Sequence, residues 1–399
     1  MSKLSYPYYN INSIEKVKKI LKSGKVNYWT GEECKKFEKK FSNYLGNKYS
    51  ISVSNGSVAL ELALRSLELK IGDEIIVSPR SFIISASCVF NLRLKPVFAD
   101  VDVNGNLSIE GISKAYSKKV KAIIIVHLNG LSCDLDPILK FVKKNKVLII
   151  EDCSQAHGAV YKNKKVGSYG DISTWSFCQD KIISTGGEGG MVSTNNKKLW
   201  LKMWSYKDHG KNYKTVFQKK IENGFRWSHD YLGSNYRMME IQAAIGIEQL
   251  KSLDKQVKIR NLIANLYINS FRDYYVKYDV LKKPNFKCNT CPLKLELKKC
   301  NKCTHAYYRL NLYLNKKKVN QRKLINELKK NNINCGVGSC PEIYREKIFR
   351  KLNFYPKKRL SNAKLLGETS LMFPINPYKS LTNIKSQINS IKKILNKYI

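Results

Sequence analysis

Three short segments place chemically capable side chains directly after or beside apolar, strand-like runs. In SVSNGSVALELAL, the turn Asn55-Gly56-Ser57 separates a strand from a helical pattern. In VLIIEDCSQAHGA, Glu151 and Asp152 follow an apolar strand, and in SFCQDKIISTGGEGGMV, Lys181 precedes a glycine-rich turn. In α/β sheets, ligands collect at the carboxyl ends of the strands. We therefore expect these three segments to meet at one edge of a sheet.

The turn at Gly56 and Ser57 is a candidate anion site. The first N–H groups of a helix have no partner within the helix, and glycine lets a phosphate approach them closely. An ordinary strand-to-helix turn capped by Ser57 would have the same sequence. Considered alone, this segment favours the ordinary turn.

The carboxylates at positions 151 and 152 allow two functional interpretations. A carboxylate at a strand end can keep a heterocyclic nitrogen protonated through a charge-assisted hydrogen bond, and it can also bind magnesium. A solvated aspartate would fit the segment equally well when it is considered alone.

Lys181 could act as a nucleophile if the glycine turn holds it away from water. A desolvated lysine can lose its proton and attack a carbonyl. The glycines do not form a Walker loop, because the GK[ST] ending is missing and the lysine precedes them. Considered singly, Lys181 would be one of many surface lysines.

The surrounding elements predict an α/β domain with a largely parallel sheet. Strands are expected at Ile51–Val53, Glu74–Val77, Pro96–Ala99, Ala122–Val126, Val147–Ile150 and Thr174–Phe177. A long helical pattern from Met239 to about Asn269 leads toward a smaller α+β domain. We expect a large domain at residues 1–250 and a small one at 251–399, the latter containing a four-cysteine insertion at 288–303.

Composition narrows the class of protein. A chain of 399 residues with no apolar run long enough to span a bilayer and no signal peptide is expected to be cytoplasmic. The formal net charge is +41, but the lysines are spread over the whole chain, which favours a solvated surface over a specific nucleic-acid site. The charge would still favour an anionic substrate.

Four of the eleven cysteines form two CxxC pairs in KCNTCPLKLELKKCNKC. Such pairs can close a tetrahedral, structural zinc site. Their linker is shorter than the commonest ribbon spacing, and four reduced thiols in a loop are the other interpretation. The candidate zinc ligands are Cys288, Cys291, Cys300 and Cys303.

Together, a phosphate cradle, a carboxylate for a pyridine nitrogen and a lysine for an aldehyde match the requirements of pyridoxal phosphate (PLP). The chain also resembles the DegT/DnrJ/EryC1/StrS family of PLP-dependent sugar aminotransferases, which have the aspartate-aminotransferase fold, fold type I. The resemblance rests on the order and spacing of several segments. They are TGEECKKFEKKFSNYLG, SVSNGSVALELAL, GDEIIVSPRSF, PVFADVD, IEDCSQAHGA, SFCQDKIISTGGEGGMV, GSNYRMMEIQAAIGIEQL and HAYYR.

The resemblance implies a role for each matched residue. Lys181 would bond the aldehyde carbon of PLP, Asp152 would pair with the pyridine nitrogen and Gln155 would lie beside the phenolic oxygen. Gly56, Ser57 and Ser176 would bind the phosphate, and Phe82 would stack on the ring. Asn235 would reach the phosphate in the neighbouring subunit, which requires a homodimer with shared active sites.

The implied reaction transfers an amino group, with L-glutamate as donor, to a nucleotide-linked keto sugar for amino-sugar and surface polysaccharide synthesis. Relatives with histidine in place of the lysine are sugar dehydratases or deoxygenating enzymes, and Lys181 argues against that alternative. A basic, zinc-containing nucleic-acid-binding or regulatory protein is an alternative of a different class. Arg80 departs from the family pattern and could contact an anionic part of the substrate or be exposed.

Overall fold

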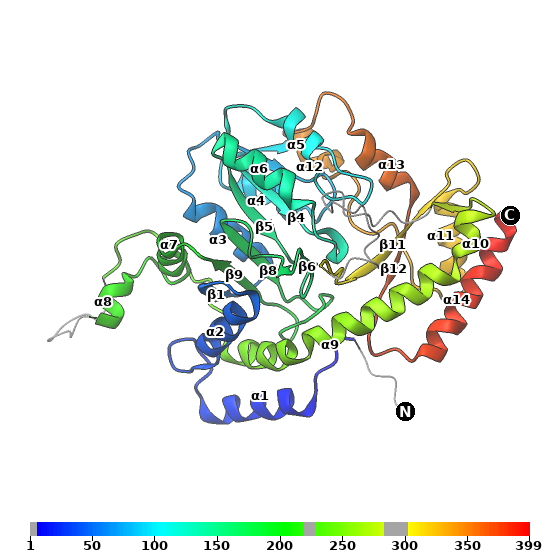
Figure 1. Ribbon diagram of the computed structural model, residues 1–399. Coiled ribbons are helices and arrows are strands. Elements are labelled where there is room, and N and C mark those ends of the chain that lie inside the picture. Colours follow the sequence, from blue (N-terminus) through cyan, green and yellow to red (C-terminus); the bar gives the residue numbers. More distant parts are fainter. Residues whose placement is uncertain (1–5, 219–227, 283–301) are drawn as a thin grey trace.

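The computed structural model describes residues 6–218, 228–282 and 302–399. Its main feature is a seven-stranded sheet in the order β1-β9-β8-β5-β4-β2-β3 (Figure 1). In that order the strands are β1 (Tyr49–Val53), β9 (Gly190–Thr194), β8 (Ile172–Ser176), β5 (Leu148–Asp152), β4 (Val120–Val126), β2 (Glu74–Val77) and β3 (Lys95–Phe98). β9 runs antiparallel to β1 and β8, and the other neighbouring pairs are parallel.

The sheet confirms the expected α/β class and the six predicted strands, within a few residues at their ends. β9 was not predicted, because its sequence GMVST follows the glycine turn and reads as part of it. Its pairing with both β1 and β8 lets the strands that precede Gly56 and Lys181 end at the same edge.

Helices cover both faces of the sheet, so the strands are buried on both sides. One face packs against α2 (Glu33–Leu45), α5 (Ile109–Ala115), α6 (Leu135–Asn145) and the first half of α9 (Glu240–Ser270). The other packs against α3 (Gly56–Ser66), α4 (Ile84–Asn91) and α7 (Lys197–Lys207). Alternate residues of one strand therefore enter different cores, as Ile123 and Ile124 of β4 do.

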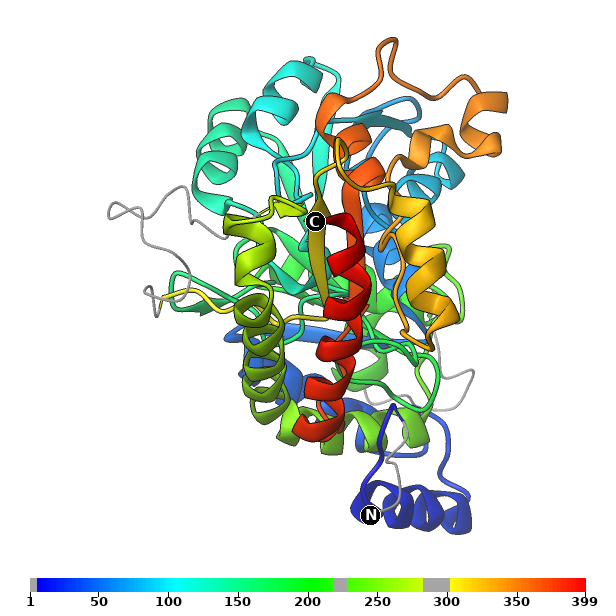
Figure 2. The ribbon, with the colours of Figure 1, turned by 90° about the vertical axis from the view of Figure 1, so that its right-hand side faces the viewer.

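A second core surrounds a three-stranded antiparallel sheet of β10 (Leu281–Lys282), β11 (Arg309–Leu314) and β12 (Ser370–Pro374). Its helices are α10 (Arg272–Val276), α11 (Gln321–Lys330) and α14 (Leu381–Leu395), whereas α13 (Ser361–Thr369) forms a small separate cluster with Val101. Figures 1 and 2 show α9 running from the large sheet to this second unit. Val257 packs in the first core and Ile263 in the second, so the proposed division at residue 250 falls inside α9.

The remaining elements are short or peripheral. They are α1 (Ile11–Ser23), α8 (Tyr213–Gln218), α12 (Lys347–Lys351), the hairpin β6 (Val160–Tyr161) and β7 (Lys164–Lys165), and the 3-10 turns η1 (Leu128–Gly130), η2 (Ile343–Arg345) and η3 (Asn396–Tyr398). Within the described ranges, no helix has both the length and the apolar character needed to span a membrane.

Candidate active site

The start of α3 and the end of β8 meet at the carboxyl edge of the large sheet. Gly56 is the first residue of α3, and the Asn55 side chain caps the helix by accepting the Val58 N–H at 2.9 Å. A Cβ added to Gly56 would lie 2.5 Å from the Cβ of Ser176, the last residue of β8. Glycine is therefore required at this position, and the helix N-terminus lies directly beside the serine side chain.

Glu151 and Asp152 are the last two residues of β5 and point to opposite faces of the sheet. Glu151 is fully buried and accepts the backbone N–H groups of residues 167, 169 and 170. Burial would raise the pKa of Glu151, but the hydrogen bond and charge of His127 and these N–H groups lower it overall. Glu151 therefore has a structural role, and Asp152 is the carboxylate that could pair with a heterocyclic nitrogen.

Asp152 lies at the sheet edge and is 6% exposed. One of its carboxylate oxygens accepts the Ser154 N–H at 3.1 Å, and the other has no hydrogen-bond partner among the described residues. Gln155 lies just beyond it, and its side-chain oxygen accepts the Asn129 N–H at 2.8 Å. This hydrogen bond fixes the orientation of the Gln155 amide.

Lys181 is held beside the sheet edge by its neighbour Asp180 and by residues from two distant segments. Its ammonium group lies 3.0 Å from the carboxylate of Asp180. The Tyr308 hydroxyl donates to the same carboxylate, and an Arg309 nitrogen lies 3.1 Å from it. The Tyr6 hydroxyl donates to the carbonyl of Lys181. The side chain of Lys181 is consequently only 17% exposed, unlike that of an ordinary surface lysine.

Asp180, Tyr308 and Arg309 were not assigned roles from the sequence. Burial would raise the pKa of Asp180, but the charge of Lys181 and the Tyr308 hydrogen bond lower it overall, so the carboxylate stays ionised at neutral pH. The motif HAYYR was a signal for Tyr308 and Arg309, but its contact with Asp180 spans 128 to 129 residues of sequence. This contact exists only because the small unit packs against the large one.

Phe82, Ser57 and Asn235 lie at the surface of the chain. The side chain of Phe82 is 68% exposed, and Ser57 at the start of α3 is also exposed. Asn235 is exposed in a segment whose backbone pairs with Asp208. Their expected contacts are with the cofactor or with a second subunit, so their roles stay predictions.

Arg80 is not exposed, so that interpretation of its departure from the family pattern is wrong. The side chain is fully buried between the two units, where one guanidinium nitrogen donates to the Ser370 hydroxyl at 3.1 Å.

Two groups of side chains could be considered as metal ligands, one in the large unit and one formed by the predicted zinc-binding cysteines. His127, Glu151 and Cys153 offer ligand atoms within 4.8 Å of one another. However, the Cys133 N–H donates to one ring nitrogen of His127 at 3.1 Å, and the other bonds Glu151 at 3.0 Å, so neither is available to a metal. Of the predicted zinc ligands, three lie outside the described residues, namely Cys288, Cys291 and Cys300.

The residues at the sheet edge fit PLP. The Gly56 turn, where a Cβ would collide with Ser176, suits a phosphate, because the helix start supplies N–H groups and positive potential beside the serine hydroxyl. Asp152 offers an oxygen to a ring nitrogen, and Lys181 offers an amine within a partly enclosed site. The donor set is that of an aldehyde-bearing phosphorylated pyridine rather than of a metal ion.

Comparison with known proteins agrees with this geometry. The solved structure of an aminotransferase from Psychrobacter cryohalolentis superposes with a TM-score of 0.93, at 41% identity over 99% of both chains. An uncharacterized protein of Methanocaldococcus jannaschii is 33% identical over 96% of this chain and 95% of its own. GDP-perosamine synthase of Escherichia coli O157:H7 is 40% identical over 59% of this chain and 62% of its own. Residues 8–392 match the DegT/DnrJ/EryC1/StrS aminotransferase family, and the chain belongs to that family.

Proposed function

We propose that this protein is a PLP-dependent aminotransferase that moves an amino group from L-glutamate to a nucleotide-linked keto sugar. The family match and the functions named for its relatives confirm the expected class, a sugar aminotransferase. The main observation in support is the position of Lys181. Its side chain is largely buried and paired with Asp180, at the sheet edge where Asp152 and the Gly56 turn also lie.

When bound, PLP supplies an aldehyde that takes up the amino group and a ring that accepts the electron pair released at the donor's α-carbon. Asp152 would hold the proton on the ring nitrogen, which keeps that ring electron-poor. The N–H groups at the start of α3 would bind the phosphate and fix its position. Lys181 would carry the proton to and from the donor's α-carbon once its amine is free.

Asp180 and Arg309 would position Lys181 between these steps. The carboxylate holds the ammonium group at 3.0 Å and is itself held by Tyr308 and Arg309. Tyr308 packs in the core of the large sheet and Arg309 begins β11 of the small unit, so the carboxylate beside Lys181 is held from both units.

Borohydride reduction tests the assignment of Lys181. The purified protein should show a visible absorption band that borohydride removes, leaving PLP fixed to the peptide containing Lys181. Lys181→Ala should lose the adduct and transamination, whereas Lys164→Ala, which changes an exposed lysine on β7, should keep both. Recovery of the reduced adduct on another lysine would show that the assignment is wrong.

The nucleotide is proposed from the relatives. The name of GDP-perosamine synthase refers to a GDP-linked amino sugar, which makes a GDP-linked keto sugar the first substrate to test. Product analysis would also separate the dehydratase alternative, because a dehydratase releases a deoxygenated sugar without a new amine. Salt-dependent retention on DNA without turnover would instead favour the nucleic-acid-binding alternative.

We further propose a homodimer with shared active sites. In support, exposed Asn235 lies close in sequence to two exposed apolar side chains, Tyr231 at 68% and Leu232 at 92%. Adjacent exposed apolar groups are typical of a protein interface. Mixing Lys181→Ala subunits with Asn235→Ala subunits should restore one intact site per heterodimer. Confirmed subunit exchange without recovered activity would contradict the shared-site proposal.

Zinc binding by the four cysteines also remains a proposal. Cys303 is the described member, and its sulfur lies 3.4 Å from the backbone nitrogen of Lys162, whose N–H it accepts. Metal-bound ligands commonly accept such hydrogen bonds from outside the coordination shell. This contact supports a role for the cysteine segment near the β6–β7 hairpin.

A further inference from the structure

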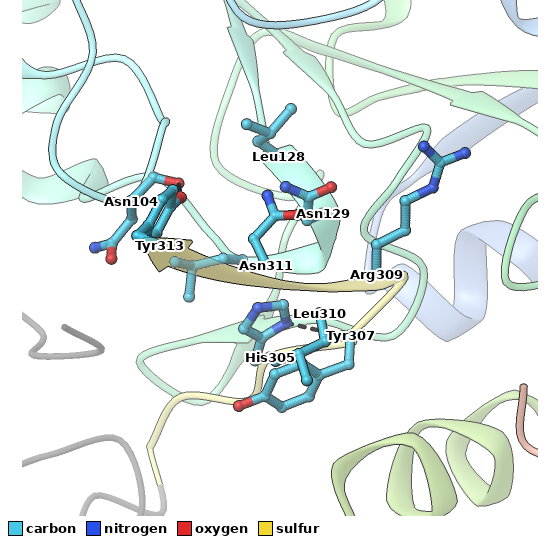
Figure 3. Close-up of a pocket in the computed structure, with 10 residues that line it drawn as sticks. Asn104, Leu128, Asn129, His305, Tyr307, Arg309, Leu310, Asn311 and Tyr313 are labelled. Carbon is cyan, nitrogen blue, oxygen red and sulfur yellow. Dashed lines mark hydrogen bonds between the residues drawn. The ribbon is translucent and has the colours of Figure 1, made fainter. Parts of the chain in front are cut away.

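A small polar cavity lies where β11 crosses the loop that follows β4. Its volume is about 20 Å³, and the polar side chains on its wall include Asn104, Asn129, Asn311 and Tyr313. Figure 3 shows Asn311 pointing from β11 toward Leu128 and Asn129. The cavity thus joins residues of the large unit to residues of the small one.

Several buried polar atoms around this cavity have no hydrogen-bond partner in the described part of the chain. They are the side-chain oxygen of Asn129 and both amide atoms of Asn311, although the Asn311 side chain lies near enough to the Tyr313 hydroxyl to counter part of the rise in pKa that burial gives Tyr313. Asn129 is only 5% exposed. Leaving such atoms unpaired in a protein interior costs free energy, so their clustering indicates a place built for a polar ligand.

Arg80 adds a positive charge behind the cavity. A Cβ added to Gly105 would lie 3.2 Å from the Arg80 Nε and 3.0 Å from Leu128, which lines the cavity. Ser370, which bonds the Arg80 guanidinium, is paired with Tyr313 across the β11–β12 ladder. Arg80 therefore lies behind the cavity, near Leu128 and Tyr313, two of the residues that line it.

Among the described residues, the guanidinium has no ion-pair partner. Its Nε and Nη1 also have no hydrogen-bond partner in these ranges. Burial lowers the pKa of Arg80, although Tyr313, Cys340 and Glu342 oppose this effect. An arginine remains charged even so, and a buried charge without a partner is costly. An anion would satisfy it.

The cavity adjoins the proposed cofactor site on two sides. The Asn129 N–H bonds Gln155, and Arg309 bonds Asp180, the partner of Lys181. Arg309 and Asn311 share one face of β11, so their positions are about 7 Å apart along the strand. In an extended glutamate, the amino nitrogen and the side-chain carboxylate are about 5 Å apart. Arg309 lines the cavity and also bonds Asp180, so the cavity begins one side chain away from the partner of Lys181.

We infer that this cavity, with Arg80 behind it, binds the side-chain carboxylate of the amino donor. Arg80 offers unpaired N–H groups, and rotation of either asparagine amide can turn its NH₂ group toward the ligand. The volume admits a carboxylate and excludes a sugar or a nucleotide, which need hundreds of Å³. The inference rests on the proposed function. It would explain why Arg80 differs from the family pattern, because the arginine would then select the amino donor.

The test compares amino donors in the first half-reaction of the PLP-loaded enzyme, followed by absorbance. Arg80→Met should raise the KM for L-glutamate by about tenfold or more, because it removes a charge-assisted interaction. L-Alanine, which has no side-chain carboxylate, should react unchanged. Arg80→Lys should recover part of the loss, and Arg322→Met, which changes an exposed arginine on α11, should have no effect.

Asn311→Asp supplies a second variant of nearly identical shape. The new carboxylate would pair with Arg80 and repel the donor, so the KM for L-glutamate should rise while that for L-alanine stays constant. Calorimetry with glutarate, a dicarboxylate without an amine, gives a readout that is independent of turnover. Glutarate should bind the wild type at least about tenfold more tightly than either variant.

Three results would overturn the inference. Equal use of glutamate and alanine by the wild type would do so while leaving transamination intact. If chloride stabilises the protein and glutarate does not compete with it, the cavity binds a free inorganic anion instead of the donor carboxylate. Unchanged glutarate binding in folded Arg80→Met and Asn311→Asp would exclude the cavity altogether. Failure of every amino donor would instead count against the proposed function, and the glutarate measurement would still report on the cavity.

Discussion

Gly56→Ala is expected to damage the phosphate cradle through a steric clash that can be worked out from the structure. The new Cβ would lie 2.5 Å from the Cβ of Ser176, whereas ordinary contacts begin at 3.4 Å, so the two segments must separate by about 0.9 Å. Overpacking of this kind costs about 1–3 kcal/mol. The higher helix propensity of alanine would offset up to about 1 kcal/mol of that cost.

The same displacement should weaken cofactor binding. A hydrogen bond of about 2.9 Å stretched by a similar distance is no longer formed, and bonds to charged groups contribute about 1.5–3 kcal/mol. The Kd for PLP should therefore rise about 10- to 100-fold. Absorbance titration of the apo protein would measure this change, and denaturant unfolding would measure stability.

Two further variants separate the clash from other effects. Gly336→Ala is the matched control, because its nearest neighbour is a Met372 side-chain carbon at 3.7 Å. Adding Ser176→Gly to Gly56→Ala removes the closest contact and leaves the Cα at 3.1 Å. Stability should then recover in part, while PLP affinity stays low because the serine hydroxyl is gone. Wild-type stability and PLP affinity in Gly56→Ala would refute the reasoning.

Three other predictions concern the protonation of His157, the role of Asp152 and the binding of zinc. Burial and then the charge of Lys181 lower the pKa of His157 from 6.5 to about 3, so the unfolded chain binds this proton first. Folding stability should fall by up to about 1.4 kcal/mol per pH unit as the pH drops below 6.5, and His157→Leu should flatten this slope in acid unfolding titrations; an unchanged slope would contradict the burial argument. Asp152→Asn should lower the transamination rate about 10²- to 10⁴-fold while the borohydride adduct on Lys181 survives, and near-normal rates would remove Asp152 from the mechanism. The purified chain should carry about one zinc, with Zn–S distances of about 2.3 Å by X-ray absorption, and Cys288→Ser should release it without loss of the visible PLP band; a metal-free, folded and active protein would refute the zinc proposal.

The sequence by itself determined the parts of this protein that depend on local patterns. Apolar runs identified six of the seven strands of the large sheet, because strands buried on both faces read as continuous hydrophobic segments. The chemistry at strand ends identified Asp152 and Lys181 as candidates, and the order of the motifs indicated the family. β9 was not predicted, because a short strand next to a glycine-rich turn has no such apolar pattern.

Only the tertiary structure decided what surrounds those candidates. The contact of Arg309 with Asp180 joins residues 129 positions apart, and that of Arg80 with Ser370 joins residues 290 apart. Both form only when the small unit packs against the large one, so no local periodicity encodes them. Whether a lysine is enclosed or an arginine is buried without a counter-charge depends on that packing, because desolvation is a property of the whole fold rather than of any segment.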